Sequence, residues 1–214
     1  MHNPFHDAQP KLKLVTFQSL EAVRDLVNKG YLECAEDHID LKKYGYAYSW
    51  ISEKMKERIK NDSSVCYPLW CWVKCHDHIC PPKHKGEPVK GFDVKVTFAK
   101  AADEVFITDF IRYSFLLNHT YIPDSLADKE RFDKKLAGQT QAVSEIRREI
   151  EKSFDRCITT DSDILQGCVW RISLEEIEKI EFLNDKSYRY GSLNHKRSDG
   201  KRVNWIEAFY RTLR

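Results

Sequence analysis

The sequence predicts a single α+β domain in which helices flank a mainly antiparallel sheet. The chain has 214 residues, of which 42% are hydrophobic, and this suits one domain with its own core. Segments that alternate apolar and polar residues are mixed with segments of helical periodicity, in the order β-α-α-β-β-β-α-α-β-α-α. We expect this domain over residues 11–182, with a flexible arm at 1–10 and a basic extension at 183–214.

The first predicted elements are a strand and two helices. Residues 11–17 alternate with period two, as a half-buried strand does. Residues 19–29 carry apolar side chains at helical spacing, and Gly30 stands where a helix C-cap is expected. A second helix is predicted over residues 46–59, with its apolar face toward the core.

Three strands and another helix follow. Residues 67–75 are rich in aromatic and β-branched side chains, residues 92–98 alternate cleanly, and residues 104–108 form a third short apolar run. Thr108 or Asp109 can cap the helix that continues to Leu117.

The last third of the chain is more polar. A long helical region is predicted over residues 126–157, and a strand over residues 164–172. Ser173 and Glu176 form a capping box, which predicts a helix from there to Phe182. A short amphipathic helix is expected at residues 203–213.

Charge and cysteine content narrow the class of protein. The net charge is +2, so the whole chain offers no electrostatic attraction for nucleic acid or membranes. We find neither a signal peptide nor an apolar run of the ~18–20 residues that a membrane span needs. Seven cysteines, an odd number, favour reduced thiols. We therefore expect a cytoplasmic protein without a membrane partner.

The cysteines and histidines between residues 66 and 84 form the one cluster with metal-ligand character. Cys75, His78, Cys80 and His84 can supply two thiolates and two imidazoles to a tetrahedral, structural zinc. The alternative is that the cysteines are small core residues and the histidines belong to an exposed connection. This alternative is the favoured one.

Polar side chains embedded in apolar elements are the candidate site residues. Gln18 ends the first strand, and Gln166 lies in a late strand among apolar neighbours. A buried amide needs hydrogen-bond partners, which either the backbone or a bound polar ligand can supply. In the second case Thr16, Gln18, Tyr48 and Trp50 are the ligand-binding candidates. Asp109 then offers a carboxylate acceptor. The ligand would be small and polar, or nucleotide-like.

Several segments in this order resemble the bacterial domain of unknown function family 3841. Across residues 11–182 they are Thr16-Phe17-Gln18, Ala47-Tyr48-Ser49-Trp50, Tyr67-Pro68-Leu69-Trp70-Cys71-Trp72, Phe106-Ile107-Thr108-Asp109-Phe110 and Leu165-Gln166-Gly167-Cys168-Val169-Trp170. The chain departs from the family pattern at Val15, where Trp is usual, and in the Cys/His-rich stretch 75–84. The resemblance brings no activity with it.

The set of candidate residues is also similar in outline to the ADP-ribosyltransferase fold. That similarity implies a domain that uses NAD, with Thr16 or Gln18 at the ribose and Tyr48 on the nicotinamide. Gln166 would stand where that family has a catalytic glutamate, and Asp109 would serve as an acceptor. Gln166 and Asp109 are therefore the candidate catalytic residues. A glutamine has no negative charge with which to stabilise an oxocarbenium-like centre.

Residues 185–214 differ in charge from the rest of the chain. They hold eight Lys/Arg and three Asp/Glu residues, a net charge of +5, with five aromatic residues interleaved. Basic groups with stacking aromatics are typical of single-stranded nucleic-acid surfaces, which makes a nucleic-acid or protein interaction module the alternative function. The other interpretation, which is favoured, is a tail whose apolar residues dock on the core.

Overall fold

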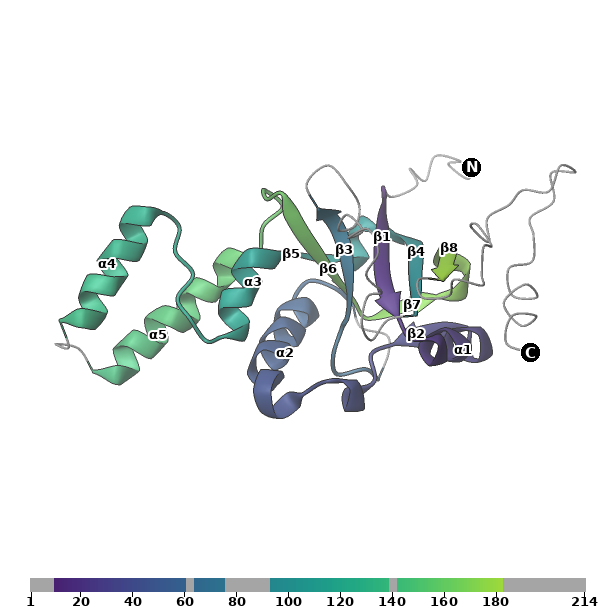
Figure 1. Cartoon of the computed structure of the whole chain (residues 1–214), viewed down its shortest axis with the longest axis horizontal. Helices are drawn as coiled ribbons and strands as arrows, with labels where there is room; N and C mark the ends of the chain where they lie inside the picture. The colour runs from purple at the N-terminus through teal and green to yellow at the C-terminus, as the bar shows by residue number, and fades with distance from the viewer. Residues whose placement is uncertain (1–9, 61–63, 76–92, 139–141, 183–214) are drawn as a thin grey trace, which may run out of the picture.

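The structure is a computed structural model that describes residues 10–60, 64–75, 93–138 and 142–182. It confirms a single α+β domain with helices around an antiparallel sheet (Figure 1). The main sheet has six strands in the order β5-β6-β3-β1-β4-β8, and each neighbouring pair runs antiparallel. Among the described residues, no helix combines the length and the apolar character that crossing a membrane requires.

Strand β1 lies at the centre of the sheet and pairs with β4 along its whole length. A second sheet of two short strands, β2 and β7, packs beside the first. The strands are β1 (Lys11–Gln18), β2 (Tyr31–Glu33), β3 (Leu69–Cys75), β4 (Val94–Ala101), β5 (Phe106–Asp109), β6 (Ile164–Val169), β7 (Arg171–Ser173) and β8 (Ile177–Phe182). Strand β2 was not predicted, because three residues are too few to show a period.

Helices α1 to α4 begin at side-chain caps, whereas α5 begins after Ala142 without one. The Ser19, Asp40 and Asp109 side chains each accept a hydrogen bond from a backbone N–H in the first turn of α1, α2 and α3. The helices are α1 (Leu20–Lys29), α2 (Leu41–Lys56), α3 (Phe110–Leu117), α4 (Leu126–Ala137) and α5 (Val143–Ser153). Helix α2 begins five residues before the predicted start because Asp40 caps it there. Gly30 ends α1 with a φ of 82°, which confirms the predicted C-cap.

The predicted helix from Ser173 to Phe182 is wrong. Its capping box forms, but the helical turn stops at Glu176 and the chain continues as strand β8. A register shift opposite Thr97 and Phe98 brings Ile177 and Ile180 over the same face of β4. This bulge gives β8 an apolar spacing of three, which is also the spacing of a helix.

The strand predicted over residues 164–172 divides at Trp170. Residues before it form β6 in the main sheet, and residues after it form β7, which pairs with β2. The region predicted as helical over 126–157 also divides, into α4, α5 and a final 3-10 turn.

Three hydrophobic clusters hold the described part of the domain together, and the smallest packs Val23 of α1 on Val94 and Val96 of β4 and Ile180 of β8. The first joins α2 and α3 to β5 and β6, and includes Ile51, Leu116 and Phe154. The second joins α1 and β2 to the main sheet, and includes Leu14, Leu26 and Phe98. In Figure 1 α2 lies below the part of the sheet formed by β5, β6 and β3, and α1 lies below the part formed by β4 and β8. The chain between these two helices contributes to the site described below.

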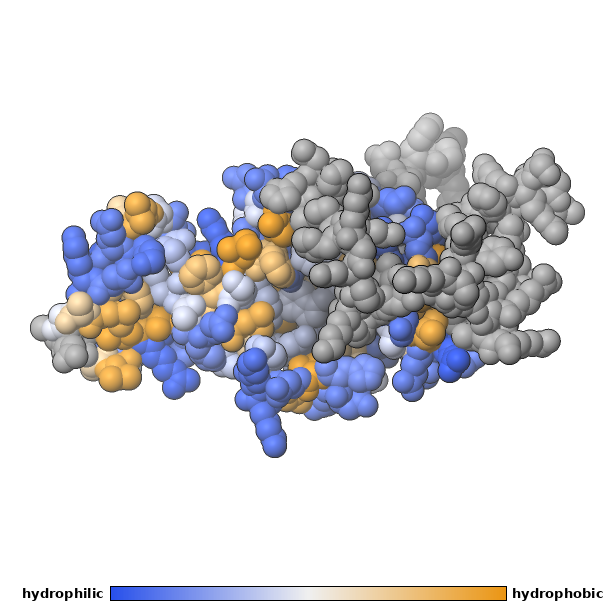
Figure 2. Space-filling model, viewed as in Figure 1, coloured by the Kyte–Doolittle hydropathy of each residue, from blue (hydrophilic) through white to orange (hydrophobic). Residues whose placement is uncertain are grey.

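Helices α4 and α5 form a hairpin that extends away from the sheet (Figure 1). Tyr121 stacks on Phe132 of α4, with ring centroids 4.0 Å apart. The Tyr121 hydroxyl, Arg131 and Arg156 all hydrogen bond to the Asp128 carboxylate, which fixes the base of the hairpin. Figure 2 shows apolar residues among hydrophilic ones over this hairpin, where Leu126, Leu136 and Val143 are exposed.

Candidate functional site

A pocket of about 810 Å³ opens beside the junction of β1 and β3. Its lining comes from both strands, from β6, from α1, α2 and α3, and from the chain between α1 and α2. Four of the residues predicted as site residues line it, namely Thr16, Gln18, Tyr48 and Gln166.

The junction of β1 and β3 is held partly by side chains. The two strands share the register pair Val15–Trp72, whereas β1 shares eight pairs with β4. Next to this pair, Thr16 Oγ1 donates a hydrogen bond to the Trp70 carbonyl oxygen at 2.8 Å. Gln18 Nε2 in turn donates to Thr16 Oγ1 at 2.9 Å. Thr16 thus fixes both the strand junction and the Gln18 amide.

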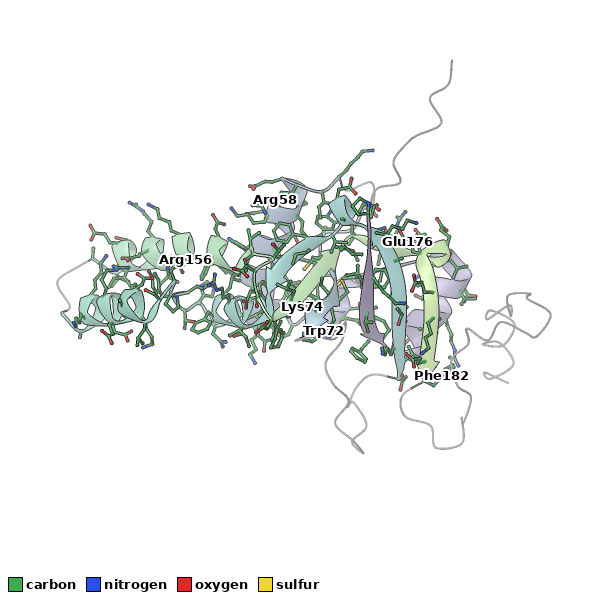
Figure 3. All side chains as sticks on the ribbon, turned by 90° about the horizontal axis from the view of Figure 1, so that it is seen from above. Arg58, Trp72, Lys74, Arg156, Glu176 and Phe182 are labelled. Carbon is green, nitrogen blue, oxygen red and sulfur yellow. The ribbon has the colours of Figure 1, made fainter. Side chains whose placement is uncertain are left out.

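Gln166 lies in the middle of β6. It pairs in register with Trp72 of β3 and Thr108 of β5 (Trp72 is labelled in Figure 3). Residues directly opposite one another across antiparallel strands share a face of the sheet. No hydrogen bond joins the Gln166 amide to another side chain of the described residues, so its donor and acceptor groups are available to a ligand.

Aromatic side chains from α2, β3 and α3 supply the apolar part of the lining. The rings of Tyr48 and Trp70 are perpendicular with centroids 6.2 Å apart, and the rings of Trp70 and Tyr113 are 4.6 Å apart. Burial raises the pKa of the Tyr48 hydroxyl, while a hydrogen bond with Trp70 acts in the opposite direction. Burial also raises the pKa of Tyr113 well above its ordinary value. Both hydroxyls are therefore neutral at pH 7.

Carboxylates line the pocket as well, and sequence reasoning missed them. Glu21 and Asp25 come from α1, Glu33 from β2, and Asp37 from the turn before α2. Their sequence pattern is that of ordinary solvated charges, which gave no signal. It is the return of the chain along the pocket after Gly30 that brings them together.

Cys34 also lines the pocket, but its thiol is not activated. Burial, together with the negative charge of Asp37, raises the pKa of the Cys34 thiol to about 11. A nucleophilic cysteine needs the opposite shift, toward the thiolate.

Trp50 and Asp109, which the sequence placed at the site, do not line this pocket. Trp50 packs edge-on against Phe154, with ring centroids 6.4 Å apart, in the cluster between α2 and α3. The Asp109 carboxylate accepts a hydrogen bond from the Arg112 backbone N–H at 2.7 Å and so caps α3. Asp109 therefore has a structural task that accounts for its position.

The predicted zinc ligands fall at the limit of the described residues. Cys75 ends β3, and His78, Cys80 and His84 lie outside the described residues. Within the described part of the chain, no group of three or more His, Cys, Asp or Glu side chains is arranged to hold a metal ion. Residues 1–9 of the arm predicted at 1–10, the basic stretch 185–214 and the helix predicted at 203–213 also lie outside it. The zinc and nucleic-acid interpretations stay predictions.

Comparison with known proteins gives one relationship. No curated protein and no solved structure matches the chain. A family model described as a domain of unknown function, DUF3841, matches residues 13–178, from the first strand of the main sheet to the start of its last. This match includes all four predicted site residues that line the pocket. Because it covers most of the 214 residues, the chain belongs to the DUF3841 family.

Proposed function

We propose that this protein binds a small ligand with a flat polar ring, such as a nicotinamide or nucleoside group, in the pocket beside β1 and β3. One observation carries the proposal: the polar groups of Thr16, Gln18 and Gln166 line the same pocket as the rings of Tyr48 and Trp70. At about 810 Å³ the pocket is within the range of small-molecule sites, which is roughly 300–1,000 Å³.

The two glutamines suit recognition of a polar ring. Each amide has two donor hydrogens and an acceptor oxygen. Gln18 uses one donor on Thr16 and keeps its remaining groups, while the amide of Gln166 makes no hydrogen bond to a described side chain. A ring amide or a ribose hydroxyl can pair with these groups while an aromatic side chain packs on the ring.

The nicotinamide end of NAD is the part that we propose enters this pocket. Its nicotinamide and the attached ribose are of the kind that the two amides and the aromatic rings can bind. Its diphosphate needs cations or backbone N–H groups, and none of the described lining residues is Lys or Arg. The diphosphate would therefore lie outside this lining.

ADP-ribosyl transfer is the chemistry we propose for such a complex. Its support is that Thr16, Gln18, Tyr48 and Gln166 line one pocket, as the similarity to ADP-ribosyltransferases requires. The neutral amide of Gln166 orients the ribose by hydrogen bonds rather than by charge. Binding is the part of the proposal to test first.

The test is a calorimetric and thermal-shift titration of the full chain with nicotinamide, nicotinamide riboside, adenosine and NAD. A ligand at ~100 times its Kd stabilises by about 2.7 kcal/mol, which corresponds to a rise in Tm of roughly 5–11 °C for a chain of this size. Gln166→Leu should weaken binding by about tenfold, the cost of one lost hydrogen bond.

Trp50→Phe is the matched control, because Trp50 lies outside the pocket and should leave the affinity unchanged. The absence of any Tm shift with all four compounds at millimolar concentration would contradict the proposal.

A further inference from the structure

We infer that the group held in this pocket carries a positive charge: the site selects an organic cation, of the pyridinium or alkylammonium kind, over a neutral or phosphorylated group of the same shape. This inference rests on the proposed function and specifies its ligand.

The lining of the pocket is rich in acidic groups. Four carboxylates line it, those of Glu21, Asp25, Glu33 and Asp37. Among the described lining residues there is no Lys or Arg, and His38 is the single titratable base. All four carboxylates come from the segment between residues 20 and 38, which runs from α1 through β2 to the turn before α2.

Two of these carboxylates form ion pairs with cations that do not line the pocket. Asp25 pairs with Lys29 at 2.7 Å, and Glu33 pairs with Arg171 at 2.5 Å. Glu21 pairs with no Lys or Arg of the described residues, and the partner of Asp37 among them is the His38 imidazole, with His38 Nε2 4.0 Å from Asp37 Oδ1. The pocket therefore keeps a net negative potential.

Aromatic side chains make up much of the remaining lining. Tyr44, Tyr48, Trp70, Trp72 and Tyr113 all line the pocket. Aromatic faces carry negative charge density and attract cations that have shed part of their water, and this effect is strongest for Trp. Carboxylates and aromatic rings favour the same charge on a ligand. A phosphate group would meet repulsion from the first and gain nothing from the second.

The test compares two ligands of nearly equal shape, 1-methylnicotinamide, a permanent cation, and neutral nicotinamide. We expect the cation to bind about tenfold more tightly in low salt, and the difference to shrink as ionic strength rises. Nicotinamide mononucleotide should bind more weakly than nicotinamide riboside, because the added phosphate faces the carboxylates.

The double variant Glu21→Gln with Asp37→Asn should remove most of the preference for the cation. Its matched control is Asp103→Asn with Glu130→Gln, which changes the net charge equally at exposed positions outside the pocket. Equal affinity for 1-methylnicotinamide and nicotinamide would overturn the inference and leave the proposed function standing. Failure of every compound to bind would contradict the proposed function and the inference with it.

Discussion

The Thr16 hydroxyl donates to the Trp70 carbonyl oxygen at 2.8 Å, beside the register pair Val15–Trp72 that joins β1 to β3. The Thr16 side chain thus pairs with the Trp70 carbonyl oxygen. In a longer ladder between β1 and β3, a backbone N–H would pair with such a carbonyl group. The same hydroxyl accepts from Gln18 Nε2, so the strand junction and the position of a site amide depend on one residue. Thr16 is 2% exposed, which removes water as a substitute partner.

Thr16→Val should therefore destabilise the fold by about 1–3 kcal/mol, since it leaves the Trp70 carbonyl and the Gln18 amide unpaired at nearly constant volume. Urea unfolding monitored by Trp fluorescence measures this change. Thr108→Val is the matched control, because Thr108 Oγ1 is buried and has no hydrogen-bond partner. That variant should be neutral or stabilising, and an equal loss in both variants would contradict the role of Thr16.

Gly167 of β6, next to Gln166, has no room for a side chain. A Cβ there would lie 2.9 Å from both Cys71 Sγ and Val105 Cγ1, closer than side chains pack. Gly167→Ala should cost roughly 1–3 kcal/mol of unfolding free energy through overpacking.

Gly45→Ala provides the comparison for Gly167. Its nearest contact to a new Cβ is 3.8 Å, and it lies inside α2, where Ala is the better helix former by about 0.5–1 kcal/mol. Chemical denaturation of both variants should give shifts of opposite sign. A Gly167→Ala protein as stable as the parent would show that the Cys71 and Val105 side chains do not crowd this position as described.

The α4–α5 hairpin should weaken in acid. The backbone N–H of Asp124, the Tyr121 hydroxyl and Arg131 hold the pKa of Asp128 far below its ordinary value of 3.8. A carboxyl whose pKa is lower in the folded state stabilises the fold fully above its unfolded pKa, and this contribution is lost as pH falls toward the folded pKa.

Asp128→Asn should accordingly be less stable than the parent at pH 7, and the gap should narrow steadily below pH 4. Urea midpoints measured from pH 7 to pH 3 give this gap. Asp133→Asn, at an exposed position of the same helix, is the control and should show a small, nearly pH-independent difference. A gap for Asp128→Asn that stays constant with pH would contradict the network.

Gln18 and Gln166 could be selected from the sequence because each is a polar group among apolar neighbours, and Thr16 and Tyr48 are predicted beside them as contacts for a polar ligand. Trp50 is predicted as a stacking surface and Asp109 as an acceptor, but their side chains serve the cluster between α2 and α3 and the start of α3. A local pattern does not say which of these uses a polar or aromatic side chain has. The four carboxylates gave no signal at all, because only the return of the chain after Gly30 assembles them.

At β8, too, the local sequence pattern is not enough to predict the structure. Ile177 and Ile180 have helical spacing, and a capping box precedes them, so the local pattern favours a helix. The bulge opposite Thr97 and Phe98 makes the same spacing compatible with a strand on β4. Pairing with a strand some eighty residues earlier in the chain decides between the two, and local pattern contains no information about it.

Gln166→Glu separates binding from transfer at the site. It keeps the size of the side chain and its position between Trp72 and Thr108, and it adds a negative charge that can stabilise an oxocarbenium-like centre. If NAD binds here with its ribose near residue 166, the variant should release nicotinamide from NAD faster than the parent, by tenfold or more. Nicotinamide release followed by chromatography measures the rate, and Asp109→Asn provides a comparison that changes a carboxylate away from the pocket. An unchanged rate in Gln166→Glu, with NAD binding intact, would show that residue 166 does not contact the reacting bond and would reject ADP-ribosyl transfer at this site.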